Sequence, residues 1–215
     1  MSNDWFCRST WTKADEADFF ARFKRSRGFG NKAQYLVRQA DRLERVGSKK
    51  LLQASLMLLD KMLAEFPEEF HLAEAHGQKA SCLAKPGDPE GAIKHYRLAL
   101  KAERDFPYHQ TPVAYDFGMF VVENKIQSVY DEALAAVKHK AKTSEIKFPR
   151  EVYKYHGIHA LVAADRQDHA NAKKWAQTAL EAAGETDSGV KRHSGFGLVE
   201  NLKTKFHKSL KAIVA

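Results

Sequence analysis

The 215-residue sequence contains only two cysteines, Cys7 and Cys82. They lie far apart, and they form neither the closely spaced pairs of a zinc site nor a disulfide framework. We therefore expect both residues to be reduced, structural thiols.

Long apolar segments are also missing. No run approaches the roughly 20 residues of a membrane-spanning helix. The first residues, Met1-Ser2-Asn3-Asp4-Trp5, lack the basic and apolar segments of a secretory signal. With 44% hydrophobic and 29% charged residues, the composition is typical of a folded protein. We expect a soluble, cytoplasmic protein with no membrane partner, folded as a single domain over residues 1–215.

Catalytic motifs are scarce. Neither Cys7 nor Cys82 shows the setting of an activated nucleophile, and no paired-carboxylate motif stands out. The segment Gly28-Phe-Gly-Asn-Lys32 lacks the spacing and the following Ser or Thr of a P-loop. We expect no enzymatic activity, no catalytic residue and no cofactor.

Positive charge is present in excess and is unevenly distributed. The chain has 35 basic and 27 acidic residues, a net charge of +8. Residues 22–50 hold ten basic residues against Asp41 and Glu44, so this segment alone carries as much excess charge as the whole chain. Such a segment favours an acidic partner.

A repeat of about 40 residues is the strongest pattern. The dipeptide Phe-Pro occurs at 66–67, 106–107 and 148–149, and each copy closes an amphipathic helical run. Proline ends one helix and suits the first turn of the next, so its regular recurrence indicates repeated helical units.

Within the unit, Asp88-Pro-Glu-Gly-Ala92 followed by Ala99-Leu100 is matched 80 residues later by Asp168-His-Ala-Asn-Ala172 followed by Ala179-Leu180. Together with Tyr96, this pattern resembles the second half of a tetratricopeptide repeat. The resemblance covers about 60 residues. It departs from the family where Ala176 replaces the aromatic residue and where the units exceed the usual length. It implies antiparallel helix pairs, stacked so that small residues let the helices approach.

Capping residues and proline positions define the expected elements. We predict an all-α fold, a tetratricopeptide-like α-solenoid of stacked antiparallel helix hairpins. Residues 1–31 would hold an N-terminal capping helix, 32–183 four helix pairs, 184–195 a flexible loop and 196–215 a C-terminal capping helix. The ten predicted helices are 13–27, 32–46, 49–65, 68–84, 89–104, 112–123, 126–141, 149–165, 169–183 and 196–213.

One basic stripe is a candidate binding surface. Its residues follow helical spacing of i, i+4, i+7 and i+11 and are Arg38, Arg42, Arg45 and Lys49. They would share one helical face, opposite the apolar Leu36, Ala40 and Leu43. The alternative is an ordinary solvated face, stabilised in part by Asp41 and Glu44. The resemblance implies that the first helix of each pair lines the concave groove, which favours binding.

A second candidate surface precedes this stripe. Phe19, Phe20 and Phe23 alternate with basic residues and lead into a glycine-rich turn. Arginines and aromatic residues together can bind nucleic acid through phosphates and base stacking. The alternative, which we favour, is that the phenylalanines belong to the core.

Ten histidines raise the question of a metal. The best pair, His156 and His159, lacks a third ligand at suitable spacing, so we expect surface histidines and no metal. Tyr153 and His156 are instead candidate partner-binding residues of the groove.

These observations favour a non-enzymatic scaffold or adaptor that holds a protein with an acidic or extended surface; a neutralising or immunity-type partner fits this class. The alternative is a nucleic-acid-associated protein that binds phosphates through residues 22–50.

Overall fold

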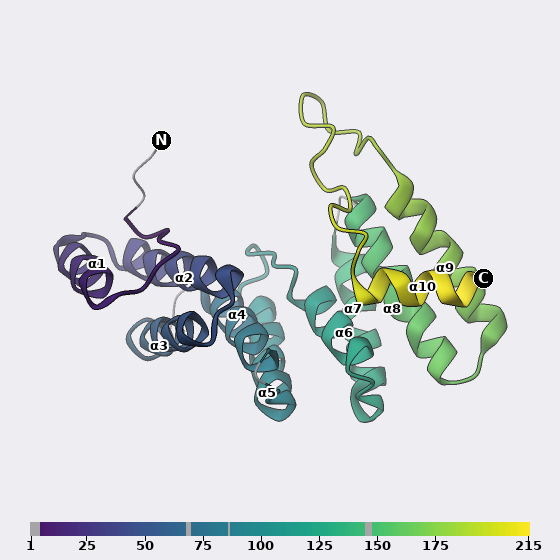
Figure 1. Ribbon diagram of the computed structural model, residues 1–215, viewed down its shortest axis with the longest axis horizontal. Helices are drawn as coiled ribbons and strands as arrows, with labels where there is room; N and C mark the ends of the chain where they lie inside the picture. Colours follow the sequence, from purple (N-terminus) through teal and green to yellow (C-terminus); the bar gives the residue numbers. More distant parts are fainter. Residues whose placement is uncertain (1–4, 68–69, 86, 145–147) are drawn as a thin grey trace. The chain divides into compact units, whose positions relative to one another are not determined.

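The computed structural model describes residues 5–67, 70–85, 87–144 and 148–215, and this part of the chain is all-helical, without β-strands (Figure 1). The prediction of an all-α fold with about ten helices is confirmed. The α-helices are α1 (Lys13–Arg25), α2 (Phe29–Val46), α3 (Lys49–Glu65), α4 (Leu72–Ala84), α5 (Pro89–Asp105), α6 (Val113–Glu123), α7 (Tyr130–Thr143), α8 (Pro149–Asp165), α9 (His169–Gly184) and α10 (Lys205–Val214). A short 3₁₀ helix, η1 (Gln127–Val129), precedes α7.

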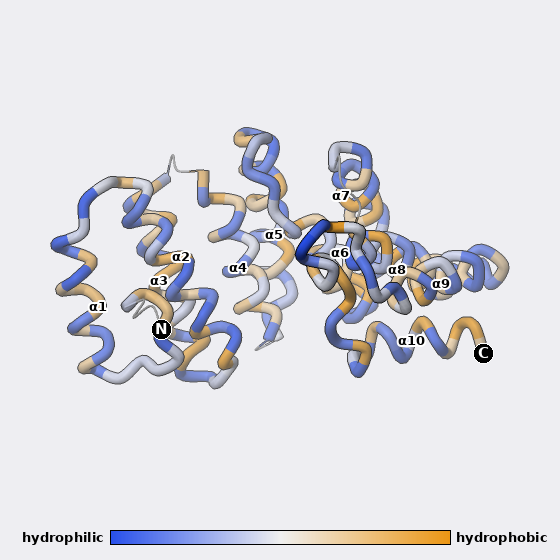
Figure 2. Tube along the Cα trace, turned by 90° about the horizontal axis from the view of Figure 1, so that it is seen from above, coloured by the Kyte–Doolittle hydropathy of each residue, from blue (hydrophilic) through white to orange (hydrophobic). Residues whose placement is uncertain are grey.

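None of the helices in the described residues combines the length and the apolar character needed to span a lipid bilayer. Figure 2 shows the reason: hydrophilic and hydrophobic residues alternate in short runs along the helices. This alternation is the pattern of helices that bury one face and expose the other.

The chain divides into two compact units, Met1–Val113 and Ala114–Ala215. In the first unit, α2 packs on α3, α3 on α4 and α4 on α5, and α2 also touches α4. The turn between α2 and α3 follows from local sequence. Gly47 adopts the left-handed conformation that glycine tolerates best, with φ 79°, and Ser48 caps α3 by accepting a hydrogen bond from the Leu51 amide.

The pairing of α4 with α5 uses the small residues that the sequence singled out. Asp88 caps α5 by accepting from the Gly91 amide, and Pro89 occupies the first helical position. Ala92 and Ala99 are completely buried, and Tyr96 is buried beside them. The small side chains thus lie on the packed face of α5, as their spacing predicts.

In the second unit, α8 pairs with α9, and α10 packs on both (Figure 1). Glycine allows two of these close approaches. A Cβ at Gly118 of α6 would come within 2.6 Å of Ile158 Cδ1, and one at Gly157 of α8 would come within 2.5 Å of Phe206 Cζ on α10. A larger residue at Gly157 would overpack against the rigid Phe206 ring, whereas one at Gly118 would require the flexible end of Ile158 to shift.

The predicted C-terminal helix over 196–213 is wrong at its start, because α10 begins at Lys205. Gly197 has a φ of 81°, which does not suit an α-helix, and its carbonyl accepts a 2.8 Å hydrogen bond from the Arg150 amide at the start of α8. The helix starts only after Thr204, whose hydroxyl accepts from the His207 amide.

Other boundaries also differ from the predictions. The predicted helix 13–27 ends at Arg25, and the predicted helix 32–46 begins at Phe29. The predicted helix 126–141 is a 3₁₀ turn followed by α7, which ends at Thr143. The predicted helix 68–84 begins at Leu72, where His71 is the capping residue; residues 68 and 69 lie outside the described residues.

Candidate functional site

The basic face of α2 is exposed as its spacing predicts. Arg38, Arg42 and Arg45 are all exposed, whereas the opposite face is completely buried through Leu36, Ala40 and Leu43. The three arginines therefore share a solvent-facing surface on a helix that is anchored by its other side.

The acidic residues of α2 neutralise only part of this charge. The Arg45 Nε donates to Asp41 Oδ2 at 2.8 Å, and this hydrogen bond and charge raise the pKa of Arg45. The Glu44 carboxylate instead accepts from Ser81 of α4 and from Lys85, the residue that follows this helix. Within the residues that the structure describes, Arg38 and Arg42 pair with no carboxylate. The middle of the face thus remains positively charged.

Lys49 does not extend this face. The prediction continued helical spacing across residues 47 and 48, but α2 ends at Val46 and the left-handed Gly47 turns the chain. Lys49 is exposed at the first position of α3, on a different helix. We define the basic face of α2 by Arg38, Arg42 and Arg45.

A hollow of about 410 Å³ lies at the amino end of α2. Gln34 stands one helical turn before Arg38, so the hollow opens onto the same side of α2 as the basic face. Phe70, 43% exposed, supplies an apolar wall. The lining residues are Gly28, Gly30, Asn31, Gln34, Phe70 and His71.

The aromatic residues of the N-terminal segment belong to the core, as we favoured. Phe19 and Phe23 are buried and pack with Trp11, Leu36 and others in one cluster, and the partly buried Phe20 packs against it. The Lys32 ammonium lies 5.4 Å from the centre of the Phe23 ring. These rings are therefore not available to stack on nucleic-acid bases.

Tyr153, predicted to contact a partner, is only 5% exposed. Its hydroxyl lies 3.3 Å from His207 Nδ1, and its ring meets Phe206 edge to face at 5.4 Å between centroids. Burial raises the pKa of Tyr153 to about 12. Because α10 covers this side chain, a partner cannot touch it directly.

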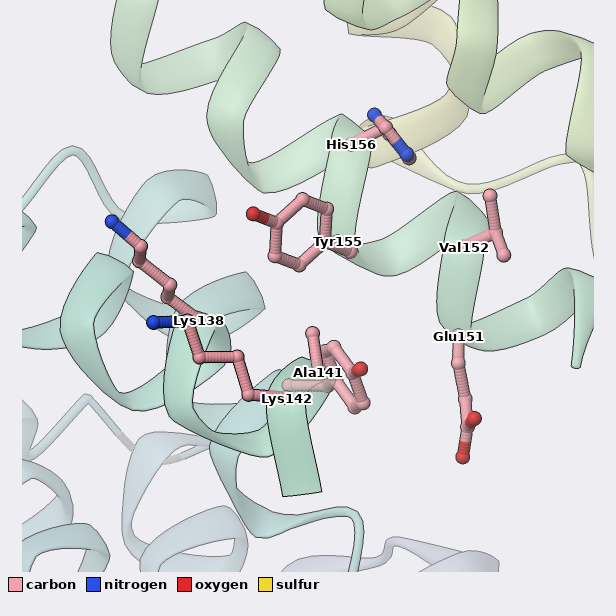
Figure 3. A pocket seen from close by; sticks show the side chains of 8 residues that line it. Lys138, Ala141, Lys142, Glu151, Val152, Tyr155 and His156 are labelled. Atoms are coloured by element: carbon pink, nitrogen blue, oxygen red, sulfur yellow. The ribbon is translucent and has the colours of Figure 1, made fainter. Parts of the chain in front are cut away.

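His156 lies beside a separate pocket of about 250 Å³ in the second unit (Figure 3). Two lysines of α7, one turn apart, line this pocket together with Tyr155 of α8. The two lysines belong to a basic stretch, residues 138–154, that the sequence shows, but the sequence alone did not assign them to a site. The lining residues are Tyr115, Lys138, Ala141, Lys142, Glu151, Val152, Tyr155 and His156.

The histidines of α8 pack against an aromatic neighbour, Trp175, with tilted rings. The rings of His156 and His159 lie 5.0 Å and 5.1 Å from the ring of Trp175 on α9. Burial lowers the pKa of both, and the charge of His159 lowers that of His156 further. His159 Nδ1 lies 2.8 Å from the Tyr155 carbonyl, to which a protonated Nδ1 donates. Burial therefore favours the neutral form of both rings.

No third potential metal ligand joins His156 and His159 among the described residues. One other group does bring three such residues together, with ligand atoms within 4.8 Å of one another: His71, Glu74 and His109. Sequence reasoning missed this group because His109 lies 38 positions beyond His71.

No family model, curated protein or solved structure matches this chain. The resemblance to tetratricopeptide repeats therefore rests on the repeat residues of the sequence.

Proposed function

We propose that this protein is a non-enzymatic helical scaffold and that the basic face of α2 holds an acidic, extended segment of a protein partner. One observation carries the proposal. Arg38 and Arg42 project from a firmly anchored helix and have no carboxylate partner in the described part of the chain. The planar, always charged guanidinium groups of arginine are well suited to bind carboxylates in two-pronged hydrogen bonds.

The spacing of the arginines suits an extended peptide. Residues one turn apart on a helix are about 5–6 Å apart along its surface. In an extended chain, side chains on the same side recur about every 6.6 Å. Alternate acidic residues of an extended segment can therefore follow the basic face of α2 without strain.

The hollow at the amino end of α2 provides a second contact. Its wall holds Phe70, and its polar lining includes Gln34 and Asn31. An apolar side chain at one end of the acidic segment would occupy part of it, against Phe70. Apolar anchors in a pocket contribute most of the affinity in many protein interfaces, and surrounding charges mainly accelerate encounter.

The arrangement of helix pairs supports this choice of surface. The pairs α2/α3 and α4/α5 follow one another, and α2 also contacts α4. In a tetratricopeptide-like array, first helices line the concave face, so α2 and α4 would form the groove. A neutralising or immunity-type role is compatible with such a groove.

The test is a fluorescence anisotropy titration of the full chain with two labelled probes, measured at several salt concentrations. One probe is a short oligoglutamate peptide that ends in an apolar residue, and the other is a duplex oligonucleotide. We expect the peptide to bind more tightly at physiological salt. Preferential binding of the duplex, with the steep loss in salt that phosphate contacts cause, would support nucleic-acid binding instead.

A further inference from the structure

We propose that His71, Glu74 and His109 form a binding site for one divalent transition-metal ion, best matched by Zn²⁺. The three side chains come from two places in the first unit. His71 caps the amino end of α4, Glu74 lies in its first turn, and His109 lies in the loop that follows α5. His71 also lines the hollow at the amino end of α2, together with Phe70, but metal binding does not require a partner peptide.

The distances suit a small metal ion. Bonds of 2.0–2.2 Å in tetrahedral zinc separate neighbouring ligand atoms by about 3.4 Å. His71 Nδ1 and Glu74 Oε2 already lie 3.4 Å apart. With all three ligand atoms within 4.8 Å of one another, closing the site around an ion requires movements of only about 1 Å.

The burial of the ring nitrogens points to a ligand. His71 is 5% exposed. His109 Nε2 is buried and has no hydrogen-bond partner among the described residues. A buried imidazole nitrogen normally has a partner, and a metal ion would accept its lone pair. This atom is the feature of the cluster that hydrogen bonding among the described residues does not explain.

The neighbours hold the ligands in orientation. Gln78 Nε2 donates to Glu74 Oε1 at 3.4 Å, which leaves Oε2 turned toward His71. Such outer contacts are a regular feature of metal sites. The Phe70 ring lies against both imidazoles, with centroid distances of 4.0 Å to His71 and 5.0 Å to His109, and shields one side of the cluster.

The loop that carries His109 is itself fixed. The His109 amide donates to the Phe106 carbonyl at 3.0 Å, and the Thr111 amide donates to Glu103 Oε1 at 2.9 Å. A metal bound here would tie this loop to the start of α4.

The ligand set selects the metal class. Two imidazole nitrogens and one carboxylate oxygen suit zinc and other late divalent transition metals rather than Ca²⁺ or Mg²⁺, which prefer oxygen ligands alone. Three protein ligands leave a further coordination position to water. Because the ion would bind the folded state, it should raise the melting temperature.

The experiment uses the full chain after treatment with a chelator. Zn²⁺ binding is measured by calorimetry, Co²⁺ binding by visible absorption, and melting with and without Zn²⁺ by circular dichroism. We expect one equivalent of metal and a rise in melting temperature. His109→Ala and Glu74→Gln should each weaken binding by at least about 100-fold, and Gln78→Ala by about 10-fold, as for outer contacts of known sites.

The control is His169→Ala, which removes an exposed histidine at the start of α9 and should bind as the parent does. Glu74→Gln preserves side-chain shape, so its folded state is expected to persist even if a histidine variant unfolds. No stoichiometric binding by the parent overturns the proposal. A second outcome also overturns it: binding that survives both Glu74→Gln and His109→Ala but is lost in His76→Ala. That outcome would locate the metal at His76 and His95, whose Nδ1 atoms lie 3.0 Å apart.

Discussion

Helices α2 and α8 were both predicted to present partner-binding residues, yet they lie in different surroundings. The predicted face of α2 is open, with Arg38 and Arg42 exposed. The predicted face of α8 is partly covered, because Tyr153 lies under α10. Residue spacing defines which side chains share a helical face, but a distant segment of the chain decides whether that face meets solvent.

The largest loss of stability should result from removing the α10 side chain that covers α8. Phe206 of α10 is only 1% exposed and packs against Gly157 and Tyr153. Phe206→Ala should destabilise the second unit by about 3–5 kcal/mol, the usual cost of removing a buried phenylalanine. Urea unfolding followed by circular dichroism measures it. The matched control is Phe196→Ala, whose side chain is 57% exposed and should cost far less. Equal effects would show that α10 does not cover α8.

A smaller loss of stability is expected at the α4/α5 pair, which belongs to the same unit as the exposed face of α2. Ala99 is completely buried, so Ala99→Leu should overpack this contact and cost about 1–3 kcal/mol. Thermal unfolding provides the measurement. Ala21→Leu, at an exposed position of α1, is the control. An unchanged melting curve for Ala99→Leu would remove the close contact from the account.

A fall in pH should change the charge of α8 but not that of the basic face of α2. Burial lowers the pKa of His156 and His159 on α8 below the ordinary value of 6.5. In acid the unfolded state therefore binds protons more readily than the folded state, and stability is lost as the pH falls below about 6.5. The arginines of α2 keep their charge throughout.

Melting temperature as a function of pH tests this difference. The double variant His156→Gln/His159→Gln should lose less stability between pH 7 and 5 than the parent. If the two profiles coincide, the titration of these histidines does not contribute to stability.

Much of the fold could be predicted from local signals. The caps Ser48 and Asp88 and the proline at 89 mark helix starts that the structure has. The start of α10 was missed because residues 196–204 adopt their path through contacts with α8, such as Gly197 with Arg150. Local helical propensity carries no information about such contacts.

The candidate sites were less predictable. The amphipathic pattern of α2 correctly gave an exposed face, because burial of Leu36 and Leu43 orients the helix. The cluster around His109 and the pocket beside His156 depend on residues from different helices and loops. Their proximity follows from tertiary packing, which spacing along one helix does not describe.

The central claim, that the basic face of α2 is the binding surface, is tested most directly by two charge-matched variants. The first is Arg38→Glu/Arg42→Glu/Arg45→Glu. The second is Lys203→Glu/Lys208→Glu/Lys211→Glu, which makes the same change in net charge at exposed positions near and within α10.

Both variants should fold, since exposed ion pairs contribute only about 0–1 kcal/mol. Anisotropy titration with the oligoglutamate peptide at physiological salt is the measurement. The account predicts that the second variant binds nearly as the parent does and that the first loses most of its affinity. Equal binding by the first variant and the parent would contradict it, and the three arginines would then form only a solvated helix face.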